Sequence, residues 1–207
     1  MAFSAADICN RASVILSVDS IISLDQKNPV ARIYASIFDL ERDMLLSEYN
    51  WGFATQFHRL KLLDEEPASN WAYAYKVPSD VLRIQAIFGE DSYTPEGLPF
   101  TLVNDGMIYT DVQHAVARAT MRIDNNGLFP PWFIDLFSAR LAVMASGALR
   151  VGSDRIEMAN LAYRQAADAA MIADASQEVR KKDRIPLLDA RRGLSVEDSG
   201  LVQDWGY

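Results

Sequence analysis

The chain has 207 residues, of which 50% are hydrophobic and 23% are charged, a balance that is typical of a folded globular protein and excludes a disordered one. Its 20 basic and 28 acidic residues give a formal charge of −8, so the chain as a whole lacks the positive surface that stable DNA binding requires. The length suits one substantial core, with a smaller inserted region.

The only cysteine, Cys9, excludes an internal disulfide and suits a reducing compartment. Cys9 lies within a helical pattern, where a small buried apolar role is favoured over nucleophilic chemistry. The N-terminus turns polar within a few residues, so we expect no signal peptide. No window approaches 18 unbroken apolar residues, which predicts no membrane span. We therefore expect a soluble protein made in the cytoplasm.

Two helices are expected in residues 1–50. Ser4 is a good N-cap, and the apolar residues behind it predict a helix over about residues 4–17. Asn28 and Pro29 supply an N-cap and a first-turn proline for a second helix that ends near Tyr49. Its apolar positions are Ile33, Ile37, Leu40, Met44 and Leu45. Its charged residues are expected on a solvated face: Asp39, Glu41, Arg42 and Asp43.

Residues 51–126 are expected to form an inserted antiparallel β subdomain. Short runs with period-two alternation or aromatic and β-branched enrichment are separated by turn residues, which predicts the strands of a meander. Asn104-Asp105-Gly106 lies between two apolar runs and is the clearest hairpin signal. His58 and His114 are expected in separate strands. The predicted strands lie in FATQFHRLKLL, WAYAYKVP, DVLRIQAIF, FTLVN, MIYTD and AVARATMRI.

Residues 127–182 are expected to form two further helices. Pro130-Pro131 ends the β region, and an apolar stripe that starts at Trp132 predicts the third helix. Ser153 caps a fourth helix with an alanine-rich face that allows close packing. The basic cluster at 180–184 suits a helix C-terminus better than a nucleic-acid patch. The sequence therefore predicts an α+β fold that is mainly α.

Residues 183–207 show no sustained period but keep many apolar and aromatic side chains. A purely solvated terminus rarely carries so much apolar surface, so we expect this tail to dock, either on its own domain or on a partner. Arg191 and Arg192 could pair with acidic surfaces through their guanidinium groups or remain solvated charges. The apolar and aromatic candidates for docking are Leu187, Leu188, Leu194, Leu201, Trp205 and Tyr207.

No reactive constellation is visible in the sequence. The two histidines form neither a zinc motif nor part of a catalytic triad, and the phosphate-binding and dinucleotide-binding glycine motifs do not occur. The acidic residues at 64–66 and Asp124 could hold a hard cation, but their spacing fits no EF-hand and favours exposed turns. We expect no catalytic residue, no cofactor and no metal. The aromatic residues near Trp51 and Trp71 are interpreted as packing residues and not as a base-stacking platform.

Four segments, in this order, resemble the tail tubular protein A family of T7-like short-tailed bacteriophages: ICNRASVILSVDSIISLDQKNPVARIY, RDMLLSEYNWGFATQFHRLKLL, WAYAYKVPSDVLRI and PPWFIDLFSARLAVMASGAL. In that family a run of the type RDxLLxxxxWxFA precedes the sheet, WxYxYxxPxDxLRI forms its first strands, and a helix beginning P-x-F follows. The similarity extends over about residues 5–175. Members of the family are head-to-tail adaptors, also called connectors.

The resemblance implies a four-helix bundle with an inserted antiparallel β subdomain and an extended C-terminal tail. It implies a dodecameric ring in the virion neck, with the portal protein above and a nozzle similar to tail tubular protein B below. Tail fibres are a further candidate partner, and DNA would contact the channel only transiently. The tail would reach the portal. Trp51, Phe53 and Trp71 would lie at the junction of the bundle and the β subdomain.

Two other readings of the sequence remain open. One is a head-completion connector of another tail type, with a similar helical core but a stopper as its lower partner, and the extended β insertion favours the short-tailed version. The other is a virion-associated cell-wall hydrolase that uses paired carboxylates, since their separation is a property of the folded chain. Turnover of purified peptidoglycan would distinguish the hydrolase from both connectors.

Overall fold

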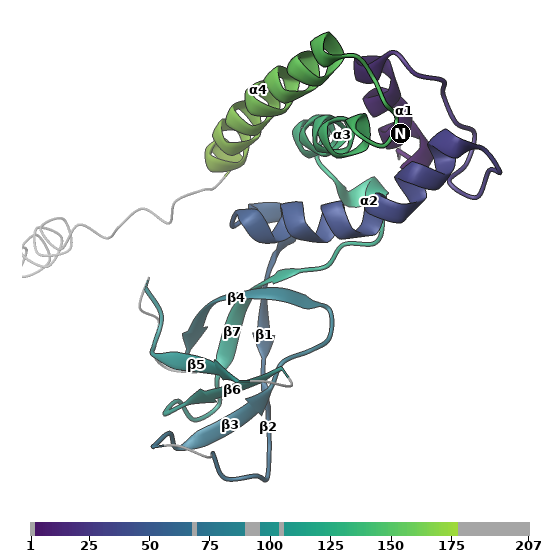
Figure 1. Ribbon diagram of the computed structural model, residues 1–207. Coiled ribbons are helices and arrows are strands. Elements are labelled where there is room, and N and C mark those ends of the chain that lie inside the picture. Colours follow the sequence, from purple (N-terminus) through teal and green to yellow (C-terminus); the bar gives the residue numbers. More distant parts are fainter. Residues whose placement is uncertain (1–2, 68–69, 90–95, 104–105, 178–207) are drawn as a thin grey trace, which may run out of the picture. The chain divides into compact units, whose positions relative to one another are not determined.

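The computed structural model describes residues 3–67, 70–89, 96–103 and 106–177 (Figure 1). The described residues up to Ala175 belong to one compact unit. The basic cluster at 180–184 lies outside the described residues, and so do the tail candidates Leu187, Leu188, Arg191, Arg192, Leu194, Leu201, Trp205 and Tyr207. Within the described residues, none of the helices is both long enough and apolar enough to cross a membrane.

Helices α1 (Ala5–Leu16) and α2 (Pro29–Glu48) confirm the first two predicted helices. The hydroxyl of Ser4 accepts a hydrogen bond from the backbone N–H of Asp7, and the Asp7 carboxylate accepts one from the Ser4 backbone, which together form a capping box. The side chain of Asn28 caps α2, with Pro29 in its first turn. Both helix starts are therefore set by local sequence.

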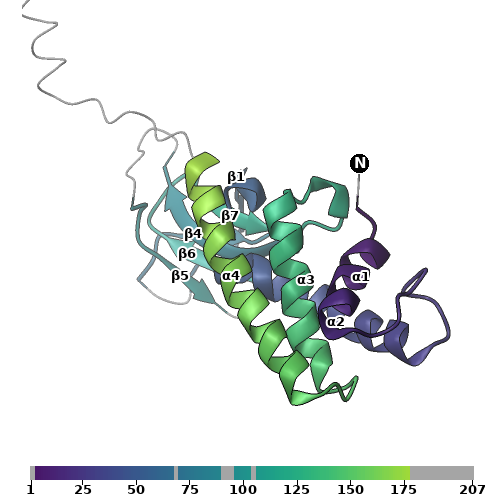
Figure 2. The same cartoon turned by 90° about the horizontal axis from the view of Figure 1, so that it is seen from above.

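Helices α3 (Pro131–Ser146) and α4 (Ser153–Gln177) confirm the other two predicted helices. Figure 2 shows α3 between α1 and α4, with α2 running beneath it in Figure 1. Many α3 residues are buried, including Phe133, Leu136 and Phe137, whereas α4 buries only Ala159, Ala170 and Asp174. The helical core is therefore centred on α3, and α4 packs on it through small side chains.

The β region lies between α2 and α3 in chain order and consists of two antiparallel sheets. The three-stranded sheet has the order β1-β7-β4, and the four-stranded sheet has the order β2-β3-β6-β5. The strands are β1 (Thr55–Arg59), β2 (Lys61–Leu62), β3 (Tyr73–Lys76), β4 (Val81–Phe88), β5 (Phe100–Val103), β6 (Met107–Thr110) and β7 (Val116–Met121). A second hydrophobic core takes residues from both sheets, among them Ile84, Ile87 and Ile108.

The strands were predicted in the right segments, but their arrangement as a meander is wrong. Strand β7, the last in the sequence, lies between β1 and β4. The chain passes from one sheet to the other at Leu60, which is buried in the second core and divides one predicted run into β1 and β2. Alternation identifies a strand because it reports burial on one side, but it carries no information about the neighbouring strand. His114 lies in a turn with a φ of 56° and not in a strand.

The predicted hairpin is confirmed by the pairing of β5 with β6. Val103 pairs with Met107 in an antiparallel register. Gly106 has a φ of 66°, a conformation that glycine adopts without steric cost, while residues 104 and 105 lie outside the described residues. This turn is specified locally, as its sequence indicated.

Candidate functional site

The segment between α2 and β1 is the point where the helical core and the β region are joined. Trp51 is 1% exposed and lies just before a short 3-10 helix, η1 (Gly52–Ala54), which leads directly into β1. Its indole Nε1 donates a hydrogen bond of 2.9 Å to the backbone oxygen of Leu45. That oxygen belongs to the last turn of α2. Trp51 therefore seals the C-terminal end of α2.

The ring of Trp51 also contacts the start of α3. Its centroid lies 5.4 Å from that of Trp132 and 5.7 Å from that of Phe133, and Phe53 lies 4.9 Å from Phe133. Tyr49 completes the cluster at 4.7 Å from Trp51. These separations are in the range of favourable aromatic pairs. The chain entering the β region and the chain leaving it are thus packed against each other.

The structure brings together only two of the three aromatic residues predicted at this junction. Trp51 and Phe53 lie there, whereas Trp71 lies two residues before β3, a strand of the four-stranded sheet. The partners of Trp51 and Phe53 on α3, Trp132 and Phe133, were not predicted at this junction. Both residues follow Pro130-Pro131, which mark the start of a helix. Because this helix begins where the chain leaves the β region, the prolines are a sequence signal for aromatic residues at the junction.

A carboxylate from α4 closes the junction. Asp174 is 8% exposed, and both of its oxygens accept hydrogen bonds from the backbone N–H of Gly52, at 3.0 and 3.2 Å. A hydrogen bond to an ionised acceptor is stronger than one between neutral groups. Asp174 therefore ties the C-terminal half of α4 to the first residue of η1. The helical pattern of α4 gave no signal for this contact, because its partner lies 122 positions away.

Of the four charged residues that the sequence placed on a solvated face of α2, Asp39 is exposed as predicted, but the other three are not. Glu41 is 2% exposed and Arg42 is 6% exposed. Arg42 forms ion pairs with Asp39 at 3.0 Å, with Asp43 at 2.9 Å and with Asp124 at 3.1 Å. Helical spacing shows which residues share a face, but not that another part of the chain covers that face. Glu41 contacts Arg140 of α3, and Arg42 contacts the segment that follows β7.

The same segment makes a second ion pair with α2. Arg122, directly after β7, pairs with Asp43 at a distance of 2.8 Å. Asp124, considered as a cation ligand from its sequence, instead contacts Arg42. Residues 64–66 are exposed. Within the described ranges, no group of three or more potential ligands lies close enough to hold a metal. The ionic contacts therefore connect α2 to the end of the β region.

Arg140 of α3 forms a second polar cluster, at the contact of α2, α3 and α4. It pairs with Glu41 at 2.8 Å and with Glu48 at 3.4 Å, and it donates a hydrogen bond of 3.2 Å to the Tyr163 hydroxyl. Burial opposes the charge of Arg140, but the hydrogen bond to Glu41 and the field of Glu48 raise its pKa overall. The pKa of Tyr163 is also raised, first by burial and then by Glu48. Arg140 thus keeps its charge and neutralises the buried Glu41.

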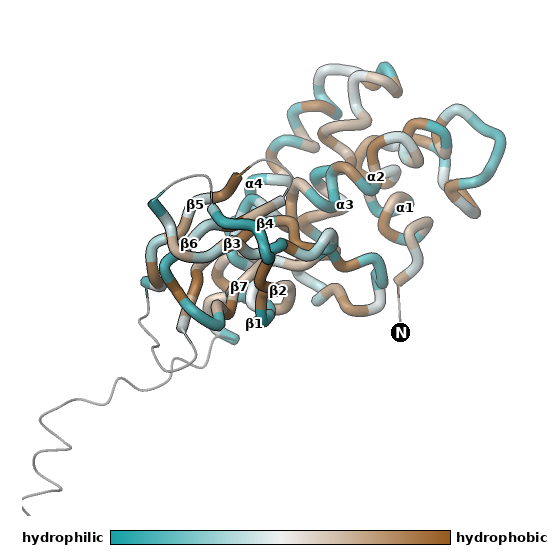
Figure 3. The backbone as a smooth tube through the Cα atoms, turned by 90° about the horizontal axis from the view of Figure 1, so that it is seen from below, coloured by the Kyte–Doolittle hydropathy of each residue, from teal (hydrophilic) through white to brown (hydrophobic). Residues whose placement is uncertain are grey.

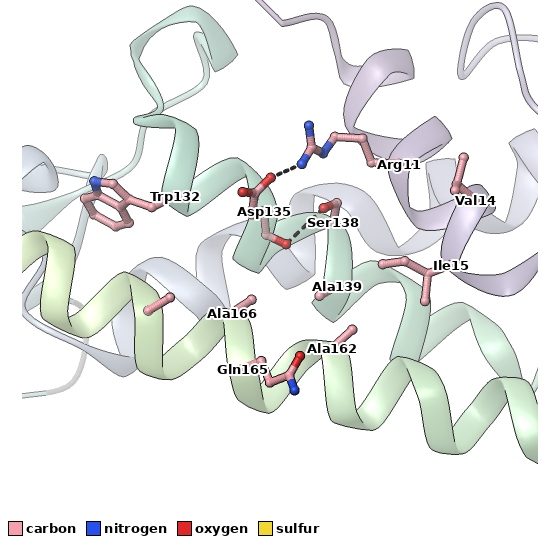
Figure 4. A pocket seen from close by; sticks show the side chains of 11 residues that line it. Arg11, Val14, Ile15, Trp132, Asp135, Ser138, Ala139, Ala162, Gln165 and Ala166 are labelled. Carbon is pink, nitrogen blue, oxygen red and sulfur yellow. Dashed lines mark hydrogen bonds and ion pairs between the residues drawn. The ribbon is translucent and has the colours of Figure 1, made fainter.

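A groove lies between α1, α3 and α4 (Figure 4). Its volume is about 540 Å³, and most of its wall is apolar. Arg11 of α1 and Asp135 of α3 form an ion pair at its edge. On the α4 side the lining consists of Gln165 and small alanine side chains, as Figure 4 shows. The groove therefore offers shape and apolar surface and contains few polar groups.

Cys9 is buried in α1, as predicted. Burial raises the pKa of its thiol to about 12. The reactive form of cysteine is the thiolate, so the Cys9 side chain stays protonated and inert at neutral pH. Its role is to fill space in the helical core.

Replacing Trp51 with alanine is expected to lower the free energy of unfolding by about 3 to 5 kcal/mol, because it removes a fully buried aromatic side chain. Trp71→Ala is the matched control and is expected to cost clearly less, since Trp71 is only partly buried and lies outside the junction. Urea titrations followed by circular dichroism measure both values. Equal losses for the two variants would contradict the central position of Trp51.

Replacing Arg140 with alanine is expected to lower the free energy of unfolding by about 3 kcal/mol, because Glu41 would remain buried without a partner. The double variant Glu41→Leu/Arg140→Met removes both charges and is expected to recover most of this loss. Chemical denaturation of both variants measures the difference. If the double variant were as unstable as Arg140→Ala, an unpaired charge would not be the cause.

No protein-family model matches the chain, and no curated protein matches it. The tail tubular protein A family therefore stands as a resemblance carried by the four quoted segments. The function has to be inferred from that resemblance together with the junction and surfaces described above.

Proposed function

We propose that the chain is a head-to-tail adaptor of a short-tailed bacteriophage, which joins the portal to the tail nozzle and forms part of the channel through which DNA leaves. The observation that carries this proposal is the order of the elements. Two helices precede an antiparallel β region and two helices follow it, which is the order that the resemblance implies. The finer arrangement in the proposal is a four-helix bundle in which α4 is the fourth member.

The junction between the helical core and the β region would keep these two regions at a fixed orientation. An adaptor has to hold one partner above it and another below it at a fixed separation, so its two regions cannot hinge freely. The chain crosses between the regions twice, and both crossings are held by Trp51 packing on Trp132 and Phe133. The ion pair between Arg42 and Asp124 adds a directional contact at the second crossing. These contacts support an assembly that transmits force between its partners.

Ring formation follows from repeating one interface. A cyclic ring uses two different, complementary faces on every copy, and the contact repeats until the ring closes. Obligate interfaces of this kind commonly bury about 2,000 Å² or more. Such a protein depends on complementary flanks and not on a reactive pocket. The proposed dodecamer needs these flanks on the helices, on the sheets or on both.

The acidic composition suits a DNA channel. Each copy carries a formal charge of −8, so a dodecamer would carry roughly −100, and an acidic channel wall repels phosphates and prevents the genome from adhering. The proposal places acidic side chains on that wall. A ring structure with a basic channel would contradict this part of it.

The C-terminal tail is proposed as the portal contact. The support is its composition, since the tail residues include Leu187, Leu188, Trp205 and Tyr207, and apolar side chains of this number favour docking over solvation. Arg191 and Arg192 would then meet acidic groups on the portal.

The proposal is tested by mass photometry of the purified chain, alone and with the matching portal ring. With twelve copies of 23.1 kDa bound, the portal is expected to gain about 280 kDa, as a closed ring requires. Deleting residues 185–207 is expected to abolish the gain. The variant Arg191→Ala/Arg192→Ala serves as the control that separates the charged contribution of the tail from its apolar one.

A portal that gains no mass, with a chain that stays monomeric in both samples, would contradict the adaptor function. A gain that survives the deletion would keep the function and move the docking surface away from the tail. Trp51→Ala offers a second check, because an unstable junction is expected to reduce the yield of complete rings. A variant that assembles as well as the parent would show that the junction does not control assembly.

A further inference from the structure

The C-terminal half of α4 is held to the rest of the protein by few side chains. Within residues 164–177, every position that is not exposed is an alanine, except Asp174. The large apolar side chains of this half point outward, since Met171 is 43% exposed and Ile172 is 71% exposed. Apolar and polar segments alternate along the helices of the protein (Figure 3). An alanine side chain buries little apolar area, so packing alone holds this half of α4 weakly.

The N-terminal half of α4 has a firmer attachment. The Tyr163 hydroxyl accepts a hydrogen bond of 3.2 Å from Arg140 and donates one of 3.4 Å to Glu48. The Arg140 guanidinium also lies over the Tyr163 ring, 5.5 Å from its centroid, which is a favourable cation–π distance. Tyr163 therefore fixes α4 to α2 and α3 about three helical turns before Asp174.

The polar contact of the C-terminal half is the one between Asp174 and Gly52. The carboxylate is 8% exposed and accepts the Gly52 N–H with both oxygens. The C-terminal end of α4 thus lies beside the segment that leads into β1 (Figure 2). If this contact opens, water replaces the lost hydrogen bonds and recovers most of their energy. Local opening is therefore cheaper here than at Tyr163.

The contact also lies between two functional parts of the sequence. Asp174 precedes by three residues the end of the described part of α4 at Gln177, and the tail with the proposed portal contacts follows in the sequence. On the other side of the contact, Gly52 is the first residue of η1, which continues directly into β1. A change at Asp174 therefore acts at once on the start of the β region.

We propose that the contact between Asp174 and Gly52 couples docking of the C-terminal tail to the junction. The inference rests on the proposed docking of the tail on the portal. In the closed state, which the structure shows, Asp174 holds Gly52. In the open state the turn that carries Asp174 has left η1, and its carboxylate is hydrated. A docked tail restricts the motion of the helix end to which it is joined, and this restriction favours the closed state.

Coupling of this kind works in both directions. If docking favours the closed state by some factor, the closed state favours docking by the same factor. A closed contact fixes η1 and with it the entry into β1. A copy that is docked on the portal is therefore stiffer at the junction than a free copy, and the partner below meets a fixed β region only after the upper contact has formed.

Exchange of the Gly52 amide hydrogen measures the contact directly, because this N–H donates to Asp174. Hydrogen–deuterium exchange followed by mass spectrometry, with fragmentation to single residues, compares the chain alone with the chain on the portal ring. We expect exchange at Gly52 to slow by about fivefold or more on portal binding. The Ile21 amide is the internal control, because it also donates to a side chain, that of Asn10, and it is expected to exchange at an unchanged rate.

Two substitutions grade the strength of the contact. Asp174→Asn keeps an acceptor oxygen without the charge, and Asp174→Ala removes the acceptor. In the chain alone we expect Gly52 exchange to be fastest in the alanine variant and intermediate in the asparagine variant, since a neutral acceptor is weaker. Portal affinity is expected to fall in the same order, by about fivefold or more for alanine. Asp168→Ala removes an exposed carboxylate of the same helix and is expected to change neither quantity.

A flexible insertion tests the route of the coupling. A short Gly-Ser segment placed after Gln177 leaves the tail sequence intact but separates it from α4. We expect this variant to keep the mass gain on the portal and to lose the slowing of Gly52 exchange. Circular dichroism verifies that each variant is folded, and the asparagine variant keeps the test decisive if the alanine variant does not fold.

The outcomes separate this inference from the proposed function. A portal that gains mass while Gly52 exchange stays unchanged would overturn the inference and leave the adaptor function standing. The same holds if folded Asp174→Ala binds the portal as tightly as the parent, if the slowing survives the insertion, or if the mass gain survives deletion of the tail. A portal that gains no mass would overturn both.

Discussion

The packing of Trp51 is the interaction on which the two regions of this protein depend. Its indole donates a hydrogen bond to the Leu45 carbonyl of α2, its ring contacts the first turn of α3, and the next residue, Gly52, is held by Asp174 of α4. One short segment therefore connects three helices to the first strand. The aromatic contacts supply burial, which is strong but non-directional, so further contacts are needed to fix an orientation.

The ion pairs of Arg42 and Arg140, whose side chains are largely buried, supply the directional contacts. Arg42 has three carboxylate partners, and one of them, Asp124, lies beyond the last strand. Arg140 joins Glu41 to Tyr163 across three helices. Charges of this kind contribute little net free energy, because removing them from water is costly. Their hydrogen bonds are geometrically strict, and this strictness suits a part that has to keep partners aligned.

An adaptor works through the stiffness of the junction between its two regions and through the surfaces that contact neighbouring copies. It does not need a reactive pocket. A stiff connection between two regions is useful to a ring component. Helix α4 buries only three of its residues in the core and exposes several apolar side chains. Its inner side is held by hydrogen bonds from Gly52 to Asp174 and from Arg140 to Tyr163.

Local chemistry in the sequence determined the elements. Ser4, the Asn28-Pro29 pair, the prolines before α3 and Gly106 act through residues a few positions away, so helix starts and the hairpin could be predicted. Only the tertiary structure decided which elements meet. The position of β7 between β1 and β4, the burial of Glu41 and Arg42, the place of Trp71 and the bond from Gly52 to Asp174 depend on partners far along the chain. Hydrophobic period and residue propensity are properties of a single segment. These contacts form only when a particular second segment packs against the first, and the sequence pattern of one segment does not say which segment that is.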